Sequence, residues 1–177
     1  MSSLDTLFAP ESVAVIGASE REGSIGRAVT ENLIGDYEGE IVPINPGSDE
    51  IMGLDAYESM TEAPEVDLAV VVVPAKITPD VVREAGEVGT KNVVVITAGF
   101  GEAGEEGEKL EQELIDISDE YDLNLVGPNC IGVMNSSINL NATFATDNAI
   151  PGNVSFMSQS GAFVSAVLNW AQDNNLG

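Results

Sequence analysis

Three kinds of residue are scarce in this sequence: it has no histidine, one cysteine and six basic residues among 177 positions. The single cysteine, Cys130, cannot form an internal disulfide, which is typical of a protein from a reducing compartment. Without a histidine, Cys130 has no evident base to activate it. We therefore expect a small, buried hydrophobic residue at this position rather than a nucleophile.

Long hydrophobic stretches are also missing. No apolar run approaches the ~18–20 residues that a membrane-spanning helix needs. The first residues, 1–5, lack the basic start and the apolar stretch of a secretion signal. We therefore expect a soluble, cytoplasmic protein with no membrane partner.

Acidic residues outnumber basic ones by thirty to six, which gives a formal net charge of −24. Such a charge repels DNA and RNA, so nucleic acid is a poor candidate partner. The acids are spread between apolar segments instead of forming a tail. They predict either a highly solvated surface or, as we favour, adaptation to molar salt, where screening shortens to ~3 Å at 1 M and self-repulsion largely vanishes.

What the sequence does have is a series of short apolar runs, at residues 13–16, 41–44, 68–73, 92–97 and 123–126. These runs are continuous rather than alternating, and most are rich in β-branched residues. Both properties are typical of parallel strands that are buried on two faces. Pro43 cannot donate to a strand ladder, so we expect the second strand to be irregular.

The segments between the runs have helical patterns. Thr78 and Pro79 predict a helix start, with a capping side chain followed by proline in the first turn. Residues 105–121 predict a surface helix, because they carry an apolar stripe at spacings of four, three and four, formed by Leu110, Leu114, Ile117 and Tyr121. Two further helices are expected, over residues 24–33 and, shorter, within 49–62. Strand and helix thus alternate five times, which predicts an α/β, Rossmann-like, doubly wound parallel sheet with right-handed crossovers.

The last part of the chain departs from this alternation. We expect the sheet domain to cover residues 1–132 and an irregular connector rich in Asn, Ser, Thr and Ala to cover 133–151. Residues 152–177 predict a strand at 153–157 and a helix at 162–171, the truncated start of a second domain. This segment is expected to form either a flap on the core or a contact between chains, so a homo-oligomer is possible.

In doubly wound sheets, ligands bind outside the carboxyl ends of the strands, where the strand order reverses. The first run is followed by a glycine-containing loop, whose main chain permits close approach of a phosphate, with the next helix directing its positive end at the anion. The candidate residues of this loop are Gly17, Ala18, Ser19, Arg21, Gly23, Ser24 and Gly26. The spacing differs from G-x-G-x-x-G, and a tight turn without a ligand is the alternative.

Two further features concern the ligand. Asn45 follows the second run, where an NAD-binding fold usually places an acidic residue for the ribose hydroxyls, and this counts against a dehydrogenase. Arg21 and Lys76 follow the first and third runs and would face the same edge. In a chain so poor in cations they favour a polyanionic ligand, although ordinary surface charge is the alternative reading.

Taken in order, five strand-end strings and one later string resemble the CoA-binding domain of ADP-forming acyl-CoA (acetate–CoA) synthetases, relatives of the succinyl-CoA ligase α subunit. The strings are 13–19 (VAVIGAS), 43–46 (PINP), 73–75 (VPA), 96–102 (ITAGFGE), 127–132 (GPNCIG) and, opening the second domain, 158–162 (SQSGA). The resemblance extends over nearly the whole chain.

This resemblance implies a coenzyme A site. The nucleotide end of CoA would lie on Gly17, Ala18, Ser19 and Arg21, with the helix that starts near Ser24 beneath a phosphate. Asn45 and Pro46 would flank the same end, and the adenine and phosphate side would be lined by Val73, Pro74 and Lys76. Thr97, Ala98 and Gly99 would guide the pantetheine arm, and Asn129 and Cys130 would lie near the reactive end. The succinyl-CoA branch tends to have a lysine after the second strand, which residues 46–48 do not offer, so Lys76 or Arg21 would have to supply that charge.

The resemblance also implies a reaction, the interconversion of acyl-CoA, ADP and phosphate with the free acid, CoA and ATP. In that family phosphate passes through an active-site histidine, and a separate ATP-grasp domain handles ATP. With no histidine, this chain is expected to be inactive alone, to contain no catalytic or metal-binding residue, and to need ligase and ATP-grasp partners that bring ATP or ADP and Mg. A CoA-sensing or acetyltransferase-fused module remains an alternative, and an NAD(P) oxidoreductase is a less favoured one.

Overall fold

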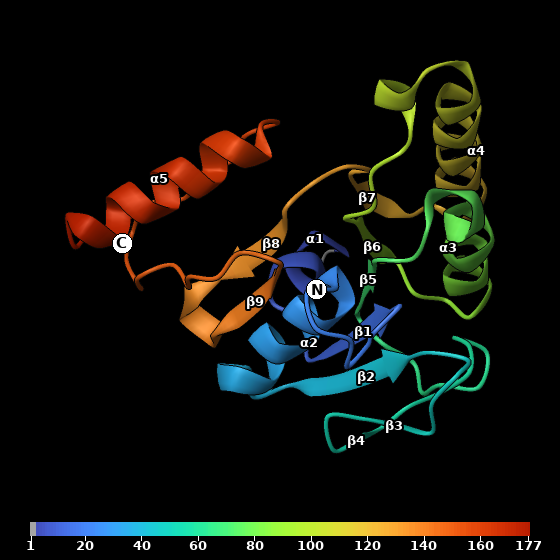
Figure 1. Ribbon diagram of the computed structural model, residues 1–177, viewed down its shortest axis with the longest axis horizontal. Helices are drawn as coiled ribbons and strands as arrows, with labels where there is room; N and C mark the ends of the chain where they lie inside the picture. The colour runs from blue at the N-terminus through green and yellow to red at the C-terminus, as the bar shows by residue number, and fades with distance from the viewer. Residues whose placement is uncertain (1–2) are drawn as a thin grey trace.

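The computed structural model describes residues 3–177 and is built around a five-stranded parallel sheet (Figure 1). The sheet has the order β2-β1-β5-β6-β7, and its members are β1 (Ser12–Ile16), β2 (Glu40–Ile44), β5 (Leu68–Val71), β6 (Asn92–Val95) and β7 (Asn124–Val126). Each neighbouring pair runs parallel. The predicted α/β doubly wound fold is therefore confirmed.

Helices cover both faces of this sheet (Figure 1). One layer contains α1 (Ser3–Phe8) and α2 (Ile25–Asp36), and the other contains α3 (Thr78–Glu87) and α4 (Glu105–Tyr121). Successive residues of β1 serve the two layers in turn: Val13 and Val15 pack with α1 and α2, whereas Ala14 and Ile16 pack with α3 and α4. Because each strand is buried on both sides, its sequence is continuously apolar.

The second strand is regular, contrary to the expectation from Pro43. β2 is an edge strand, and Pro43 pairs in register with Val15 of β1. The Pro43 carbonyl accepts the N–H of Tyr57 at 3.0 Å, so the proline nitrogen also faces away from β1. The missing donor therefore costs no bond within the sheet, which is the setting in which proline is tolerated in a strand.

No helix forms within residues 49–62, and that prediction was wrong. A two-stranded hairpin of β3 (Glu50–Ile51) and β4 (Leu54–Asp55) occupies the first half of this segment. Met52 and Gly53 form its tip with φ of 54° and 81°. Positive φ at both central residues is the mark of a type I′ turn, which matches the twist of a hairpin and ends any helix.

The predicted helix start at Thr78 was wrong in detail. Thr78 is the first helical residue rather than the cap, because the short 3-10 turn η1 (Ala75–Ile77) leads directly into α3. The Thr78 hydroxyl donates to the carbonyl of Pro74 at 3.2 Å. The apolar stripe predicted for α4 is confirmed, since Leu114 and Ile117 are fully buried.

The expected irregular connector contains a second hairpin. β8 (Gly132–Asn135) and β9 (Leu140–Thr143) pair antiparallel, joined by the 3-10 turn η3 (Ser136–Ile138). Leu140 and Ala142 are buried in the same core layer as α2, and the Asn32 amide of α2 donates to the carbonyls of Thr143 and Ala145 at 2.9 and 2.8 Å. The prediction failed because these strands are short, polar and buried by a helix distant in sequence.

The C-terminal segment contains the helix α5 (Gly161–Asp173) but no strand at 153–157. Those residues are exposed, and no strand among the described residues pairs with them. The Ser160 hydroxyl caps α5 by accepting the N–H of Phe163 at 3.4 Å. No residue of α5 is buried, and the helix stands apart from the sheet (Figure 1). Among residues 3–177, no helix has the length and apolar character to cross a membrane.

Candidate functional site

The loops that follow the five parallel strands all lie at one edge of the sheet. β1 and β5 are neighbours, yet the helices that follow them, α2 and α3, lie on opposite faces. The chain directions diverge there, and this divergence is the topological position at which doubly wound sheets bind their ligands. The edge predicted from the sequence is therefore formed, and its centre lies between β1 and β5.

Two glycines allow the first loop to pack closely. Gly17 has φ +97°, and a Cβ there would lie 3.0 Å from Val73 Cγ1, so the loop after β1 touches the loop after β5. A Cβ at Gly26 would lie 2.0 Å from the Gly17 carbonyl oxygen, so the first turn of α2 lies directly against the loop. Only glycine permits both contacts. Gly23, also at positive φ (+73°), has open space around its Cα.

Ser24 shapes the end of the loop and starts α2. Its hydroxyl donates to the Arg21 carbonyl at 2.8 Å and accepts the N–H of Arg27 at 3.2 Å, as a helix cap does. The Arg21 N–H in turn donates to Ser19 Oγ at 3.1 Å. The first-turn N–H groups of α2, which have no intrahelical acceptor, therefore lie beside an ordered loop and suit an anion.

Asn45 connects the loops after β2 and β1 rather than reaching outward. Its amide Nδ2 donates to the Ala18 carbonyl at 2.8 Å, and its Oδ1 accepts the N–H of Gly47 at 2.8 Å. With both side-chain groups bonded within the protein, Asn45 positions the first loop. Pro46, the next residue, is exposed beside it.

The remaining loops are joined in the same way. Thr97 Oγ1 donates to the Val73 carbonyl at 2.7 Å, and the Asn129 N–H donates to the Thr97 carbonyl at 2.9 Å. A Cβ at Gly99 would lie 3.1 Å from Ala75 Cβ, so these two loops are also in contact. The strand-end residues predicted from the sequence thus form one continuous row along the edge, with Pro74 and Ala98 exposed in it.

Glu102, in the 3-10 turn η2 (Gly101–Ala103), fixes the loop after β6. Its carboxylate accepts the Gly99 N–H at 2.5 Å. This main-chain hydrogen bond lowers the pKa of Glu102, so the carboxylate is ionised and holds the loop at neutral pH.

Cys130 lies at the edge but its thiol turns inward. Sγ donates to the Val95 carbonyl at 3.3 Å, against the end of β6. Burial raises the pKa of the Cys130 thiol, and main-chain hydrogen bonds offset this only in part. The thiol is therefore protonated at neutral pH, consistent with the packing role expected from the sequence.

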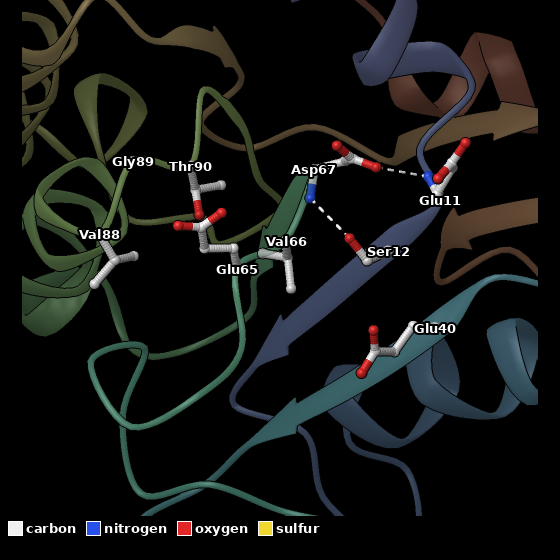
Figure 2. Close-up of a pocket in the computed structure, with 9 residues that line it drawn as sticks. All are labelled: Glu11, Ser12, Glu40, Glu65, Val66, Asp67, Val88, Gly89 and Thr90. Carbon is white, nitrogen blue, oxygen red and sulfur yellow. Dashed lines mark hydrogen bonds between the residues drawn. The ribbon is translucent and has the colours of Figure 1, made fainter.

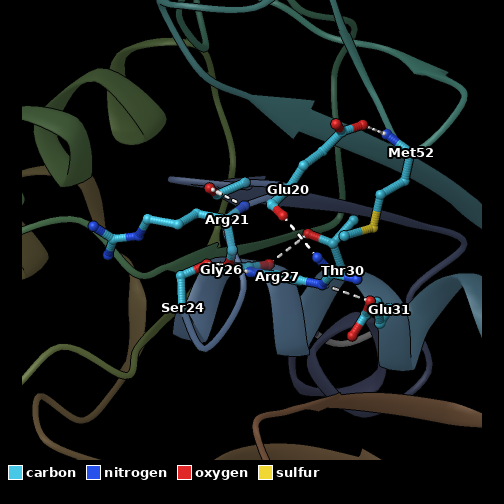
Figure 3. Close-up of polar contacts among 9 residues, drawn as sticks. Glu20, Arg21, Ser24, Gly26, Arg27, Thr30, Glu31 and Met52 are labelled. Carbon is cyan, nitrogen blue, oxygen red and sulfur yellow. Dashed lines mark hydrogen bonds and ion pairs between the residues drawn. The ribbon is translucent and has the colours of Figure 1, made fainter.

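Two cations at this edge have no ion-pair partner among residues 3–177: Arg21 in the first loop and Lys76 in η1. Both side chains are exposed, and Figure 3 shows that of Arg21 extending away from its neighbours. By contrast, Arg27 and Arg83 are paired with glutamates, and Lys91 donates to a main-chain carbonyl. In a chain with a net charge of −24, unpaired cations at this edge suit a polyanion.

Glu20 and Met52 were missed from the sequence, and Arg27 was left without a role. The Arg27 guanidinium donates to the Glu20 carbonyl, and the Glu20 carboxylate accepts the Met52 N–H (Figure 3). The only sequence signal was the position of Arg27 in the first turn of the helix after the loop. Glu20 carried no signal, because its partner belongs to a hairpin that was not predicted.

A hollow of about 540 Å³ lies at the opposite edge, at the amino ends of the strands (Figure 2). Its lining is mainly acidic and polar: Glu11, Ser12, Glu40, Glu65, Val66, Asp67, Val88, Gly89 and Thr90. Asp67 accepts the Glu11 N–H at 2.8 Å and donates its own N–H to Ser12 Oγ at 3.0 Å. Within residues 3–177, no three His, Cys, Asp or Glu side chains are grouped to hold a metal ion. The carboxylates that line this hollow would repel an anionic ligand.

Comparison with known proteins identifies the family of this chain and several similar proteins. A family model described as "CoA binding domain" matches residues 11–136. An ADP-forming acetate–CoA ligase I of Archaeoglobus fulgidus is 47% identical over 175 residues, which are 98% of this chain and 25% of that protein. The α subunit of ADP-forming acetate–CoA ligase I of Pyrococcus furiosus is 47% identical over 181 residues, covering 99% of this chain and 39% of that subunit.

A solved structure shows the same fold throughout the chain. An acetyl-coenzyme A synthetase of Ca. Korarchaeum cryptofilum, in complex with phosphate and ADP, matches with a TM-score of 0.94 and 40% sequence identity. The match covers 100% of this chain and 38% of that one. The chain thus spans a quarter to two fifths of the length of these relatives.

Proposed function

This chain belongs to the CoA binding domain family, and from that premise we propose that it is the coenzyme A-binding part of an ADP-forming acetate–CoA ligase. Relatives that are 47% identical over 98–99% of the chain carry that activity in their names. The reaction interconverts an acyl-CoA, ADP and phosphate with the free acid, CoA and ATP.

The proposal depends mainly on two features of this edge: the close packing around Gly17 and Gly26, which we call the glycine cradle, and the unpaired cations beside it. A Cβ at Gly17 would press against Val72 and Val73, and a Cβ at Gly26 would clash with the Gly17 carbonyl, so the start of α2 lies directly against this loop. Arg21 and Lys76 stand at the same edge with no ion pair among the described residues. Coenzyme A carries a diphosphate and a 3′-phosphate, so main-chain N–H groups and two free cations fit its nucleotide end.

We assign the residues along the edge as follows. The nucleotide end lies on Gly17, Ala18, Ser19, Arg21, Gly23, Ser24 and Gly26, with Asn45 and Pro46 beside it and with Val73, Pro74 and Lys76 of the neighbouring loop after β5. The pantetheine arm follows Thr97, Ala98 and Gly99 toward Asn129. Cys130 supports this end by packing, since its thiol faces the Val95 carbonyl.

The chain binds and orients CoA, whose thiol accepts the acyl group in the complete reaction. Phosphoryl transfer in this proposal belongs to other domains or subunits, because the chain has no histidine. ATP or ADP and Mg would bind in those parts. A complete enzyme of this kind acts on soluble metabolites, and we place it in the cytoplasm.

We further propose that residues 152–177 belong to a second, ligase-type domain, after a sheet domain at 1–132 and the hairpin segment at 133–151. No side chain of α5 is buried, and Phe156, Phe163 and Trp170 are between 47% and 56% exposed. Apolar surface of this kind marks a contact with another part of a protein or with another chain, including a second copy.

Adaptation to molar salt is also part of the proposal. Thirty acidic residues face only six basic ones, and the charge is distributed along the chain. Mutual repulsion of the carboxylates destabilises the fold in dilute buffer and is screened at high salt.

Isothermal titration calorimetry in high KCl tests the binding function, with CoA, dephospho-CoA and NAD as ligands. We expect CoA to bind and NAD not to bind. Arg21→Ala and Lys76→Ala should each weaken CoA binding by the value of one charge-assisted hydrogen bond, about 1.5–3 kcal/mol. Binding of NAD without CoA would instead identify a variant dinucleotide site and overturn the assignment.

A further inference from the structure

A phosphate-binding loop must keep one main-chain conformation if its N–H groups are to meet the ligand. Arg27 holds the first loop from α2. Its Nη1 donates to the main-chain carbonyl of Glu20 at 2.8 Å, and its Nε donates to Glu31 Oε1 at 2.7 Å (Figure 3). The guanidinium is thereby fixed between the loop and the next turn of the helix.

Glu20 extends this connection to the β3–β4 hairpin. Its Oε1 accepts the N–H of Met52 at 2.8 Å, at the tip of the hairpin (Figure 3). Met52 has φ +54°, a conformation that residues other than glycine adopt rarely. The Glu20 carboxylate therefore supports a turn that the local sequence disfavours, and fixes it beside the loop.

From these contacts we propose that Arg27 and Glu20 are positioning residues for coenzyme binding, with Arg27 fixing the loop main chain and Glu20 fixing the hairpin against the loop. The inference rests on the proposed function. It separates the two arginines at the site: Arg21, whose side chain has no ion pair among residues 3–177, contacts the ligand, whereas Arg27 acts through the Glu20 carbonyl.

Electrostatics support this division. The charge of Arg27 is already paired with Glu31, so it contributes little net attraction for a polyanion. A carboxylate beside a phosphate-binding loop would by itself repel the ligand. The bond from the Met52 N–H gives Glu20 a structural reason for its position, and predicts that the oxygen acceptor of Glu20 matters more than its charge.

The test for Arg27 compares Arg27→Met with Arg83→Met. Arg83 is a matched control, because its side chain is 37% exposed against 33% for Arg27, and it pairs with Glu120 at 2.9 Å on the α3–α4 layer. In calorimetric titrations, Arg27→Met should weaken CoA and dephospho-CoA by the same factor, about tenfold. Arg83→Met should leave both affinities unchanged. Equal affinities for Arg27→Met and wild type, or a selective loss of the preference for CoA over dephospho-CoA, would overturn the positioning role.

The test for Glu20 uses two uncharged replacements. Glu20→Gln keeps an oxygen that accepts the Met52 N–H, whereas Glu20→Ala removes it. We expect Glu20→Gln to bind CoA at least as tightly as wild type and Glu20→Ala to bind about fivefold more weakly than Glu20→Gln, the value of one neutral hydrogen bond. Equal binding by the two variants would show that the Met52 bond has no role.

Amide hydrogen exchange without ligand separates failure of this inference from failure of the proposed function. Arg27→Met should speed exchange at residues 18–24, and Glu20→Ala should speed it at Met52, with the sheet amides unchanged. If Arg27 or Glu20 instead contacted the ligand directly, the exchange rates of the variants without ligand would equal those of wild type. That result would contradict the positioning role even if CoA binds. If wild type binds no CoA, the proposed function fails, and with it the role in coenzyme binding, whatever the exchange rates.

Discussion

Gly26→Ala tests the close approach of α2 to the first loop. The new Cβ would lie 2.0 Å from the Gly17 carbonyl oxygen and 3.1 Å from its carbon. A carbon–oxygen contact normally needs about 3.3 Å, so one main-chain segment must move by roughly 1 Å. Alanine gains about 1 kcal/mol over glycine in a helix, but overpacking costs about 1–3 kcal/mol. Because the clash involves main chain on both sides, we expect a net loss of about 1–2 kcal/mol and about tenfold weaker CoA binding.

Gly35→Ala is the matched control for this change. Gly35 belongs to the same helix, and nothing lies within 4 Å of the position its Cβ would take. It should raise the free energy of unfolding, by up to about 1 kcal/mol, and leave CoA affinity unchanged. Urea unfolding at constant KCl measures the stabilities, and calorimetry measures the affinities. If Gly26→Ala equals Gly35→Ala in both, the loop does not depend on this contact and the cradle is wrongly described.

Three other outcomes follow from the structure. Burial raises the pKa of Tyr37 to about 12, and its hydroxyl donates to the Pro10 carbonyl at 2.7 Å. Because the pKa is higher in the folded state, the contribution of Tyr37 to stability is complete below the unfolded value of 10.0 and is lost as pH rises toward 12. Wild type should therefore lose stability between pH 10 and 12 more steeply than Tyr37→Phe. The Cys130 thiol, with its raised pKa, should react with iodoacetamide more slowly at pH 8 than the same residue in urea; equal rates would contradict its inward orientation. The melting temperature should rise steeply with KCl, and full stability in dilute buffer would refute adaptation to high salt.

The sheet and the gathering of its strand-end loops at one edge were predictable because their signals are local. A strand buried on both faces must be apolar at every position, so the runs at β1, β5 and β6 were recognisable from the sequence. The turn after β1 needs glycine at Gly17 for its positive φ, and the parallel direction of the strands then brings every strand-end loop to one edge.

The missed features depend on contacts between distant segments. The β8–β9 hairpin looked like a connector because its burial comes from α2, more than a hundred residues earlier. The part that Asn45 plays in joining the loops after β1 and β2 was also missed, because only the loop conformation shows that its amide bonds within the protein. The bond between Glu20 and Met52 was invisible for the same reason, since the hairpin that carries Met52 was expected to be helical.

Amide hydrogen exchange with and without saturating CoA tests most directly where the coenzyme binds. Binding at the carboxyl ends of the strands predicts added protection at residues 17–26, 45–47, 73–76 and 97–99. It predicts no change around the acidic hollow at the amino ends, at residues 11–12, 65–67 and 88–90 (Figure 2). Protection at the hollow, or CoA binding without protection of the first loop, would contradict a coenzyme site between β1 and β5.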